Sequence, residues 1–410
     1  MKKILTISAI IVLVATAASN SFAEGRGRIH GTVITTDGER YEGLIRWDSN
    51  EASWVDMIDC SKELKRSRRR GKDNEHVKSI YVFGVRVGKV RSKGGYDITS
   101  AQCHVAFGHL EAIEFVEDDS ALLIFKSGEK MEVKASSTDI GDNIRGIVVE
   151  DRDEGEIELD WDDIERVEFS QGGYEMYSSF GDRLYGTLTT RKGDTFTGWV
   201  CWDADEVLSD DILDGEHRNR DREIPFGKIR SIERRSSSSA RVTLKNGDEI
   251  TLKGTNDVDS SNRGISIFVE DFGVVKVDWD EFERIDFEEA SAPVDYARFD
   301  GGKLLRGTVH TDSGESYTGN IRWDDDEEYT WEIIDTVFKG VEMDIELGNI
   351  STIRRKGCCS AIITLWEGHE FKVKGSNDVD DENKGIFVIL DSGEEIEIDW
   401  DDFDFVEFKN

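Results

Sequence analysis

The chain has 410 residues, of which 37% are hydrophobic and 34% are charged, and its formal net charge at pH 7 is -35. The hydrophobic fraction is large enough for folded cores, so the composition excludes a disordered acidic chain. So strong a negative charge repels nucleic acid and anionic lipid from most of the surface and favours cations or basic proteins as partners. We therefore expect no nucleic-acid ligand.

The first 23 residues predict a secretory signal peptide. Lys2 and Lys3 precede an apolar run from Ile4 to Ala18, and Ser21-Phe22-Ala23 fits a small-x-small cleavage site. The apolar run is too short for a comfortable membrane span, and no later stretch is apolar for long enough to cross a bilayer. We therefore expect an exported protein, periplasmic or extracellular, with no transmembrane segment in the mature chain.

The rest of the chain is predicted to contain three copies of one unit, which we call unit 1 (24–170), unit 2 (183–288) and unit 3 (304–410). Units 2 and 3 align at an offset of 121 residues. In all three units, a glycine precedes a tryptophan by sixteen residues: Gly31 and Trp47, Gly186 and Trp202, Gly307 and Trp323. Repetition at a fixed period indicates a repeat architecture.

Each unit divides into two halves with strand signals. The first half opens with alternating residues around a glycine turn, which predicts a β-hairpin. These turns are Asp37-Gly38, Lys192-Gly193 and Ser313-Gly314. The second half of unit 2 contains a hairpin signal at Asn246-Gly247, then a polar loop and further strands.

About five short strands in roughly 55 residues are typical of a small SH3-like or Sm-like barrel. The expected fold is therefore all-β, with each unit a pair of such barrels. The resemblance rests on strand number and a tight closing turn, and it implies no activity, because these barrels serve unrelated functions.

Unit 1 carries a basic insertion at about residues 62–100. Trp47 and Trp161 are 114 residues apart, whereas the corresponding Trp202 and Trp279 are 77 residues apart. Twelve lysine or arginine residues and three acidic residues lie between positions 62 and 93. The densest cluster is Lys65, Arg66, Arg68, Arg69, Arg70 and Lys72. Such a run could bind an external polyanion, dock on an acidic surface of the same or another copy, or remain a solvated loop.

Five cysteines in an exported protein leave at least one unpaired within the chain. Cys60 and Cys103 lie in the same unit and could pair, or they could be small buried hydrophobic residues. Cys358 and Cys359 are adjacent, and we expect them to be geometrically poor partners. Cys201 lies in a predicted strand.

Six of the ten tryptophans precede an aspartate: Trp47, Trp161, Trp202, Trp279, Trp323 and Trp400. A tryptophan beside a carboxylate could form a platform for a sugar. One tryptophan at a fixed strand position in each predicted barrel is, however, more typical of a core anchor, since a buried indole contributes a large apolar area. We interpret all six as core anchors and expect the aspartates to point outward or to cap turns.

An Asp-rich loop occurs in the second half of every unit. The candidate ligands in these loops are Asp139, Asp142, Asp257, Asp259, Asp378 and Asp380. Several carboxylates within a few residues could bind calcium, which takes six to eight oxygen ligands, although the spacing is not that of an EF-hand. Alternatively, the side chains bond to backbone amides in Asx turns. The basic residue before the loop glycine (Arg145, Arg263 or Lys384) favours an internal ion pair.

Enzymatic signals are weak. The chain has no nucleophile-elbow pattern, phosphate-cradling loop or zinc spacing, and His104 and His109 near Cys103 would form only a weak metal cluster. We expect a non-enzymatic, exported β-repeat protein that acts as an interaction or cell-envelope scaffold and binds a protein or envelope component. The alternatives are a calcium- or carbohydrate-binding module protein and a hydrolase with a carboxylate site between units. No cofactor is expected unless calcium binds.

Overall fold

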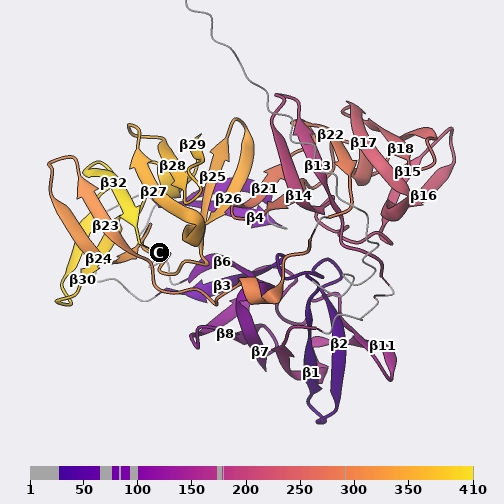
Figure 1. Cartoon of the computed structure of the whole chain (residues 1–410), viewed down its shortest axis with the longest axis horizontal. Helices are drawn as coiled ribbons and strands as arrows, with labels where there is room; N and C mark the ends of the chain where they lie inside the picture. Colours follow the sequence, from indigo (N-terminus) through magenta and orange to yellow (C-terminus); the bar gives the residue numbers. More distant parts are fainter. Residues whose placement is uncertain are drawn as a thin grey trace, which may run out of the picture.

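The computed structural model describes residues 27–64, 100–172, 178, 180–290 and 292–409, and the backbone of residues 76–82 and 85–92. This part of the chain is all-β, as predicted, with three large antiparallel sheets and several short 3-10 turns between strands (Figure 1). The predicted signal peptide and the basic cluster Lys65–Lys72 lie outside the described residues. Within the described ranges, no helix is long and apolar enough to cross a membrane.

The first sheet contains ten strands of unit 1, in the order β11-β10-β2-β1-β12-β7-β8-β9-β3-β6. Its strands are β1 (His30–Thr35), β2 (Arg40–Trp47), β3 (Met57–Glu63), β6 (Ser100–Ala106), β7 (Leu110–Glu117), β8 (Ser120–Phe125), β9 (Lys130–Ala135), β10 (Ile147–Asp151), β11 (Gly155–Leu159) and β12 (Ile164–Phe169). The insertion contributes a separate hairpin of β4 (His76–Val82) and β5 (Val85–Ser92).

The second sheet has twelve strands, in the order β16-β15-β19-β18-β17-β22-β13-β14-β20-β21-β26-β25. Unit 2 supplies β13 (Tyr185–Thr190), β14 (Thr195–Cys201), β15 (Ile212–Glu216), β16 (Asp221–Pro225), β17 (Ile229–Ser236), β18 (Ser239–Leu244), β19 (Glu249–Lys253), β20 (Ile265–Val269), β21 (Gly273–Val277) and β22 (Phe282–Phe287). Unit 3 supplies β25 (Ile333–Phe338) and β26 (Val341–Glu346).

The third sheet has eight strands of unit 3, in the order β29-β28-β27-β32-β23-β24-β30-β31. They are β23 (Arg306–Thr311), β24 (Ser316–Arg322), β27 (Ile350–Arg355), β28 (Ala361–Leu365), β29 (Glu370–Val373), β30 (Ile386–Leu390), β31 (Glu395–Ile398) and β32 (Phe403–Phe408). The 3-10 turns are η1 (Phe107–His109), η2 (Trp161–Asp163), η3 (Phe226–Lys228), η4 (Asn256–Val258), η5 (Tyr296–Arg298), η6 (Leu347–Asn349) and η7 (Asn377–Val379).

The predicted glycine-turn hairpins form as β1–β2, β13–β14 and β23–β24, and the Asn246-Gly247 turn joins β18 to β19. We expected two separate barrels in each unit, but the observed sheets have a different topology. No sheet formed by the described residues is closed, and strands of the two halves interleave: β12 pairs with both β1 and β7, and β10 pairs with β2. The closed SH3-like barrel is therefore not confirmed.

Close backbone approach at two glycines of each unit accounts for the interleaving. A Cβ atom on Gly43 would lie 2.0 Å from the carbonyl oxygen of Glu150, and one on Gly31 would lie 2.4 Å from that of Glu168. The corresponding glycines, with the same close contacts, are Gly186 and Gly198 in unit 2 and Gly307 and Gly319 in unit 3. Glycine at these positions lets strands of the second half pass directly over the first hairpin.

Units 2 and 3 share a continuous sheet, because β21 pairs with β26 in antiparallel register. At this seam, the Lys276 ammonium group lies 2.5 Å from the Asp344 carboxylate. Across the seam in unit 1, His104 and Asp59 form an ion pair at 2.5 Å. Burial by itself lowers the pKa of His104, but the Asp59 carboxylate outweighs it and raises the value to about 9, so the ring is protonated at neutral pH.

Lys276 and the charges around it form one buried network, which we call the three-unit junction: Asp59, His104, Lys276, Asp335 and Asp344. Burial and then the neighbouring Asp344 raise the pKa of Asp335 to about 7. Burial by itself lowers the pKa of Lys276. The carboxylates of Asp344, Asp335 and Asp59 outweigh burial and raise this pKa above its usual value. Lys276 and His104 thus offset carboxylates that come from units 1 and 3.

The segment between units 2 and 3 packs on unit 1. The Tyr296 ring lies 4.3 Å from that of Trp54, and the Tyr296 hydroxyl donates to the Leu110 carbonyl at 2.6 Å. Lys126 places its ammonium 3.2 Å from the centre of the Tyr296 ring. From unit 3, Trp331 stacks on Phe125 of unit 1 with a centroid distance of 5.0 Å. The chain therefore returns to unit 1 before unit 3 begins.

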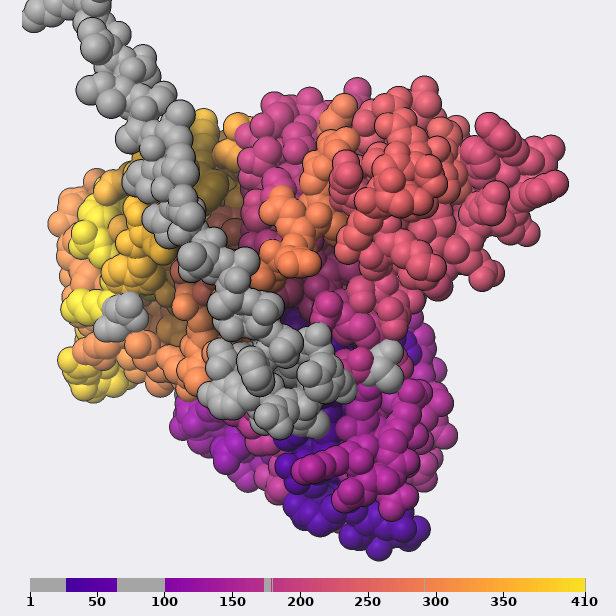
Figure 2. Space-filling model, turned by 45° about the vertical axis from the view of Figure 1, so that its right-hand side comes forward, coloured from indigo at the N-terminus to yellow at the C-terminus, as the bar shows by residue number. Residues whose placement is uncertain are grey.

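Ion pairs also join units 1 and 2. Arg46 bonds to Asp211 at 2.9 Å, and Arg183 bonds to Asp56 at 2.7 Å. In the space-filling view, the pink part of the chain (unit 2) and the orange to yellow part (unit 3) both rest on the indigo to magenta part, which is unit 1 (Figure 2). The three units therefore pack as one body.

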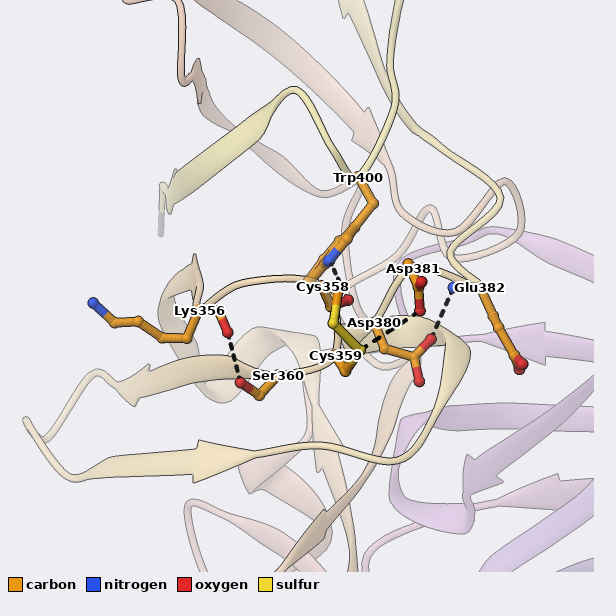
Figure 3. The surroundings of a disulfide bond; sticks show 8 residues. All are labelled: Lys356, Cys358, Cys359, Ser360, Asp380, Asp381, Glu382 and Trp400. Carbon is orange, nitrogen blue, oxygen red and sulfur yellow. Dashed lines mark hydrogen bonds between the residues drawn. A yellow bond between two sulfur atoms is a disulfide. The ribbon is translucent and has the colours of Figure 1, made fainter.

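The cysteines differ in part from the expectation. Cys358 and Cys359 form a disulfide, although adjacent cysteines had been expected to be poor partners (Figure 3). They lie in the turn between β27 and β28, where the Trp400 indole donates to the Cys358 carbonyl at 3.0 Å; an irregular turn leaves the backbone free to adopt the required geometry. Cys60 and Cys103 face each other across β3 and β6 as buried free thiols, and Cys201 is also free.

We predict that Lys276→Glu destabilises the protein. The substitution leaves Asp344 and Asp335 without the Lys276 cation, and breaking a buried pair typically costs about 3–5 kcal/mol. Urea unfolding should report this loss. The control Lys253→Glu makes the same change on an exposed strand, where the pair with Glu216 spans 3.9 Å and should contribute less than about 1 kcal/mol. Equal effects of the two substitutions would refute a special role for Lys276.

Candidate cation-binding sites

A tight turn follows the first hairpin of each unit and places an aspartate and a glutamate three residues apart. The turns are Trp47-Asp48-Ser49-Asn50-Glu51, Trp202-Asp203-Ala204-Asp205-Glu206 and Trp323-Asp324-Asp325-Asp326-Glu327. In the second turn, Asp203 and Ala204 adopt positive φ angles of 51° and 61°. The backbone N–H of Trp202 donates to the Glu206 carbonyl, and the N–H of Glu206 donates to the Trp202 carbonyl. The turn therefore places the glutamate next to the tryptophan.

The tryptophan indole then positions the Asp-rich loop. The Trp47 Nε1–H donates to the Asp139 carbonyl at 2.9 Å, the Trp202 Nε1–H to Asp257 at 3.0 Å, and the Trp323 Nε1–H to Asp378 at 2.9 Å. Each of these three tryptophans is fully buried. A core residue therefore fixes the backbone of the loop whose carboxylate points back toward the turn.

The aspartate after each of these tryptophans is buried, so of the two expected orientations the outward one is wrong at these positions. Asp48 accepts bonds from the Arg145 backbone N–H at 2.6 Å and from the Arg145 guanidinium at 3.1 Å. Asp203 and Arg263 repeat both contacts, and Asp324 is paired with Lys384 in the same way. These bonds compensate the buried charge, as the internal ion pair suggested by the sequence requires.

Each Asp-rich loop also contributes a buried aspartate, which a backbone N–H group holds in place. The Asp139 carboxylate accepts the Asp59 backbone N–H of β3 at 2.7 Å, and that of Asp378 accepts the Asp335 N–H of β25 at 2.7 Å. Asp257 makes the equivalent bond to Asp214 of β15 at 2.5 Å. In each loop carboxylate, one oxygen, Oδ2, thus accepts a backbone N–H bond from a neighbouring strand.

The glutamate of the turn completes three carboxylate clusters. In each cluster, one oxygen per residue lies within 4.8 Å of the others: Asp48, Glu51 and Asp139; Asp203, Glu206 and Asp257; Asp324, Asp326 and Glu327. One oxygen of each glutamate is buried without a hydrogen-bond partner, namely Oε2 of Glu51, Glu206 and Glu327. Glu51 is only 7% exposed. A buried polar atom without a partner is rare and calls for an explanation such as a bound ion or water.

These carboxyl groups resist ionisation. Burial, followed by repulsion from Asp257, Asp203 and Asp205, raises the pKa of Glu206 to about 9. Burial also raises the pKa of Asp257 to about 6 and holds those of Glu51 and Glu327 well above the usual range. A divalent cation would relieve this repulsion, and oxygen clusters of this kind suit calcium or magnesium.

The six aspartates predicted from the loops therefore separate into two groups. Asp139, Asp257 and Asp378 are buried beside the turn glutamates. Asp259 instead accepts from the Ser261 N–H at 2.9 Å, and Asp380 accepts from the Glu382 N–H at 2.9 Å, so both form Asx turns. Asp142 is exposed. The structure thus brings Asp139 and Asp257 into the clusters but not Asp142, Asp259 or Asp380, and in unit 3 the turn residue Asp326 takes the place of Asp378.

The two tryptophans of each unit also differ. Trp161, Trp279 and Trp400 are buried, with exposures of 2–3%, and their indoles donate to the backbone carbonyls of Glu117, Ser236 and Cys358. Here the following aspartates are exposed: Asp162, Asp280 and Asp401. All six tryptophans of the Trp-Asp pairs lie within hydrophobic cores, so none presents its face to a sugar.

Sequence reasoning missed the glutamates of the clusters. A partial signal was present as the spacing Trp-Asp-x-x-Glu at the end of the first hairpin of each unit, but the same spacing recurs at Trp161 and Trp279, so it does not single out these glutamates. The weak cluster of Cys103, His104 and His109 does not assemble. Cys103 faces Cys60, His104 pairs with Asp59, and His109 is directed to a different part of the molecule, beside Asp300 and Glu346.

Comparisons with protein-family models, with curated proteins and with solved structures found no match for this chain.

We predict that Glu206→Gln changes the pH dependence of stability. Because the pKa of Glu206 is raised in the folded state, the unfolded state loses its proton first, and this residue lowers stability progressively from about pH 4.5 to pH 9. Glutamine cannot ionise. Relative to the wild type, the variant should therefore gain stability as the pH rises from 5 to 8, by at most about 1.4 kcal/mol per pH unit. Urea unfolding at several pH values measures this difference, and parallel curves for the two proteins would contradict the prediction.

Proposed function

We propose that this protein is an exported, non-enzymatic scaffold, made of three copies of one β-unit, that binds another protein or a cell-envelope component. The observation that carries the proposal is the pairing of β21 with β26, in which one unit extends the sheet of another by strand addition. Strand addition is a general mode of recognition, because backbone bonds supply affinity while side chains on the added strand select the partner.

Matched strand orders support the three-copy architecture. Unit 1 follows the order β11-β10-β2-β1-β12-β7-β8-β9-β3, and unit 2 follows β21-β20-β14-β13-β22-β17-β18-β19-β15. Unit 3 has the order β31-β30-β24-β23-β32-β27-β28-β29, and its next strand, β25, reaches β29 through the Val337–Lys374 bridge. We further propose that the two halves of each sheet are open relatives of the SH3-like or Sm-like barrel.

The terminal strands β11 and β31 are the candidate contact edges. In each sheet they occupy the end that in unit 2 is occupied by β21. They carry Glu158 and Glu397 at the place of Lys276, as the registers with β10 and β30 indicate. An acidic edge favours a partner strand that carries lysine or arginine. The basic run at Lys65–Lys72, in a second copy or in another protein, has suitable charge and stays a sequence-based candidate.

Crosslinking tests the scaffold proposal. A photoreactive amino acid at Glu397 on β31 or Glu158 on β11 should give a discrete adduct in cells that export the protein. The control position is Asp248, an exposed residue in the turn between β18 and β19. Adducts from Glu397 and Glu158 that are no more abundant than those from Asp248 would contradict the proposal, as would retention of the protein in the cytoplasm.

Divalent-cation binding is a second candidate function. It is favoured by the unpartnered, buried glutamate oxygen that recurs in all three carboxylate clusters. The hydrolase alternative has less support, because the carboxylates that units 1 and 3 bring together, Asp59 and Asp344, are each paired with a cation, His104 and Lys276.

Calcium should raise the melting temperature if the clusters are cation sites. At a free concentration one hundred times the dissociation constant, one site adds about 2.7 kcal/mol, which corresponds to a shift of a few degrees. Thermal unfolding is compared in chelator, in calcium and in magnesium at fixed ionic strength. The shift should disappear in the triple variant Glu51→Gln, Glu206→Gln, Glu327→Gln and persist in Asp259→Asn, whose side chain lies in an Asx turn. An unchanged melting temperature in both cations would exclude these clusters as sites.

A further inference from the structure

A pocket of about 490 Å³ lies where the three units and the segment between units 2 and 3 meet. Its lining includes His109 of unit 1, Phe268 of unit 2, Asp300 of the connecting segment, and Glu346 and Trp366 of unit 3. The volume suits a ligand of one or two sugar rings, and pockets formed between packed units are common ligand sites. Neither the carboxylate clusters nor the three-unit junction contributes a residue to this pocket.

His109 is the first feature that points to a ligand. The side chain is 6% exposed, yet neither ring nitrogen has a hydrogen-bond partner. The nearest carboxylate oxygens belong to Asp300, 4.0 Å from Nδ1, and to Glu346, 3.8 Å from Nε2. These distances are too long for direct hydrogen bonds, so both ring nitrogens of His109 could accept or donate a hydrogen bond to a ligand.

Trp366 is the second feature. It is one of few large hydrophobic side chains that are exposed among the described residues, at 43%. Its backbone N–H donates to the Asn349 carbonyl at 3.1 Å, a bond that Lys126 makes to His109 in unit 1 and Lys245 makes to Lys228 in unit 2. Units 1 and 2 thus have lysine where unit 3 has tryptophan. The shared architecture therefore does not require an indole at this position.

The Trp366 ring is also held in place, because its Nε1–H donates to the Gly348 carbonyl at 3.0 Å. The indole thus offers a fixed apolar face at the pocket, with its polar atom already bonded. Lys303 and Lys409 also line the pocket, and neither ammonium group has an ion-pair partner within the described part of the chain. A fixed aromatic face beside both donors and acceptors matches a sugar ring, which has an apolar C–H face and hydroxyl groups around its edge.

We propose that this pocket binds a saccharide, with a sugar ring stacked on Trp366 and its hydroxyl groups bonded to His109, Glu346 and the neighbouring lysines. The site is distinct from the Trp-Asp pairs, whose indoles are buried. The inference goes beyond the scaffold function and does not depend on it, since the pocket is formed within a single chain.

Ligand-observed NMR on the full mature protein tests the proposal. The probes are three trisaccharides: a neutral glucose oligomer, an N-acetylglucosamine oligomer and a galacturonic acid oligomer. At least one should show saturation transfer. The variant Trp366→Lys restores the residue type found in units 1 and 2, so it should fold, and it should weaken binding by about tenfold or more, the equivalent of losing about 1.4 kcal/mol.

A second variant and a control complete the experiment. His109→Phe keeps a flat ring against Phe299 but removes both nitrogens, and it should also weaken binding. Val116→Lys makes a matched change at an exposed apolar residue of β7, outside the pocket, and should leave binding unchanged. The proposal is overturned if none of the three probes binds at 10 mM (about the weakest useful affinity), or if binding is as strong in Trp366→Lys as in the wild type.

Discussion

One network of buried charges, centred on Lys276, brings strands of all three units together. Lys276 lies on the seam between β21 and β26, and its charge offsets Asp344 and Asp335 of unit 3 and Asp59 of unit 1. Partly buried carboxylates from separate units would otherwise repel each other in a region of low dielectric constant. The β21–β26 pairing by itself joins units 2 and 3 in one sheet; the lysine also attracts Asp59 of β3, which belongs to the first sheet.

The junction is also bonded to two of the three loop aspartates. Asp139 and Asp378 accept backbone N–H bonds from Asp59 and Asp335, whose own carboxylates face Lys276. In unit 2 the corresponding bond leads from Asp257 to Asp214, which is exposed. The loops of units 1 and 3 are therefore bonded to residues of the junction, whereas the loop of unit 2 is not.

Much of the local structure could be predicted from the sequence, because hairpins depend on residues close in the chain. Turns at Gly38, Gly193 and Gly314 follow from alternation around glycine. The interleaving of β10 and β12 with the first hairpin could not, because the significance of Gly31 and Gly43 appears only when the opposing strands are known. Of the candidate site, the loop aspartates were found, while Glu51, Glu206 and Glu327 were missed because each belongs to a turn far from its loop in sequence. The disulfide between Cys358 and Cys359 could not be predicted either, because it depends on the backbone geometry of the turn between β27 and β28.

Glu158 and Glu397 have a consequence for how such a chain could lengthen. Under the three-copy architecture, the seam between units 2 and 3 exists where the edge residue is lysine, and the other two edges present glutamate at that position. Glutamate and lysine codons differ by a single base. One nucleotide substitution at either edge would thus reproduce the lysine of the seam and change the strand that the edge attracts from a basic one to an acidic one.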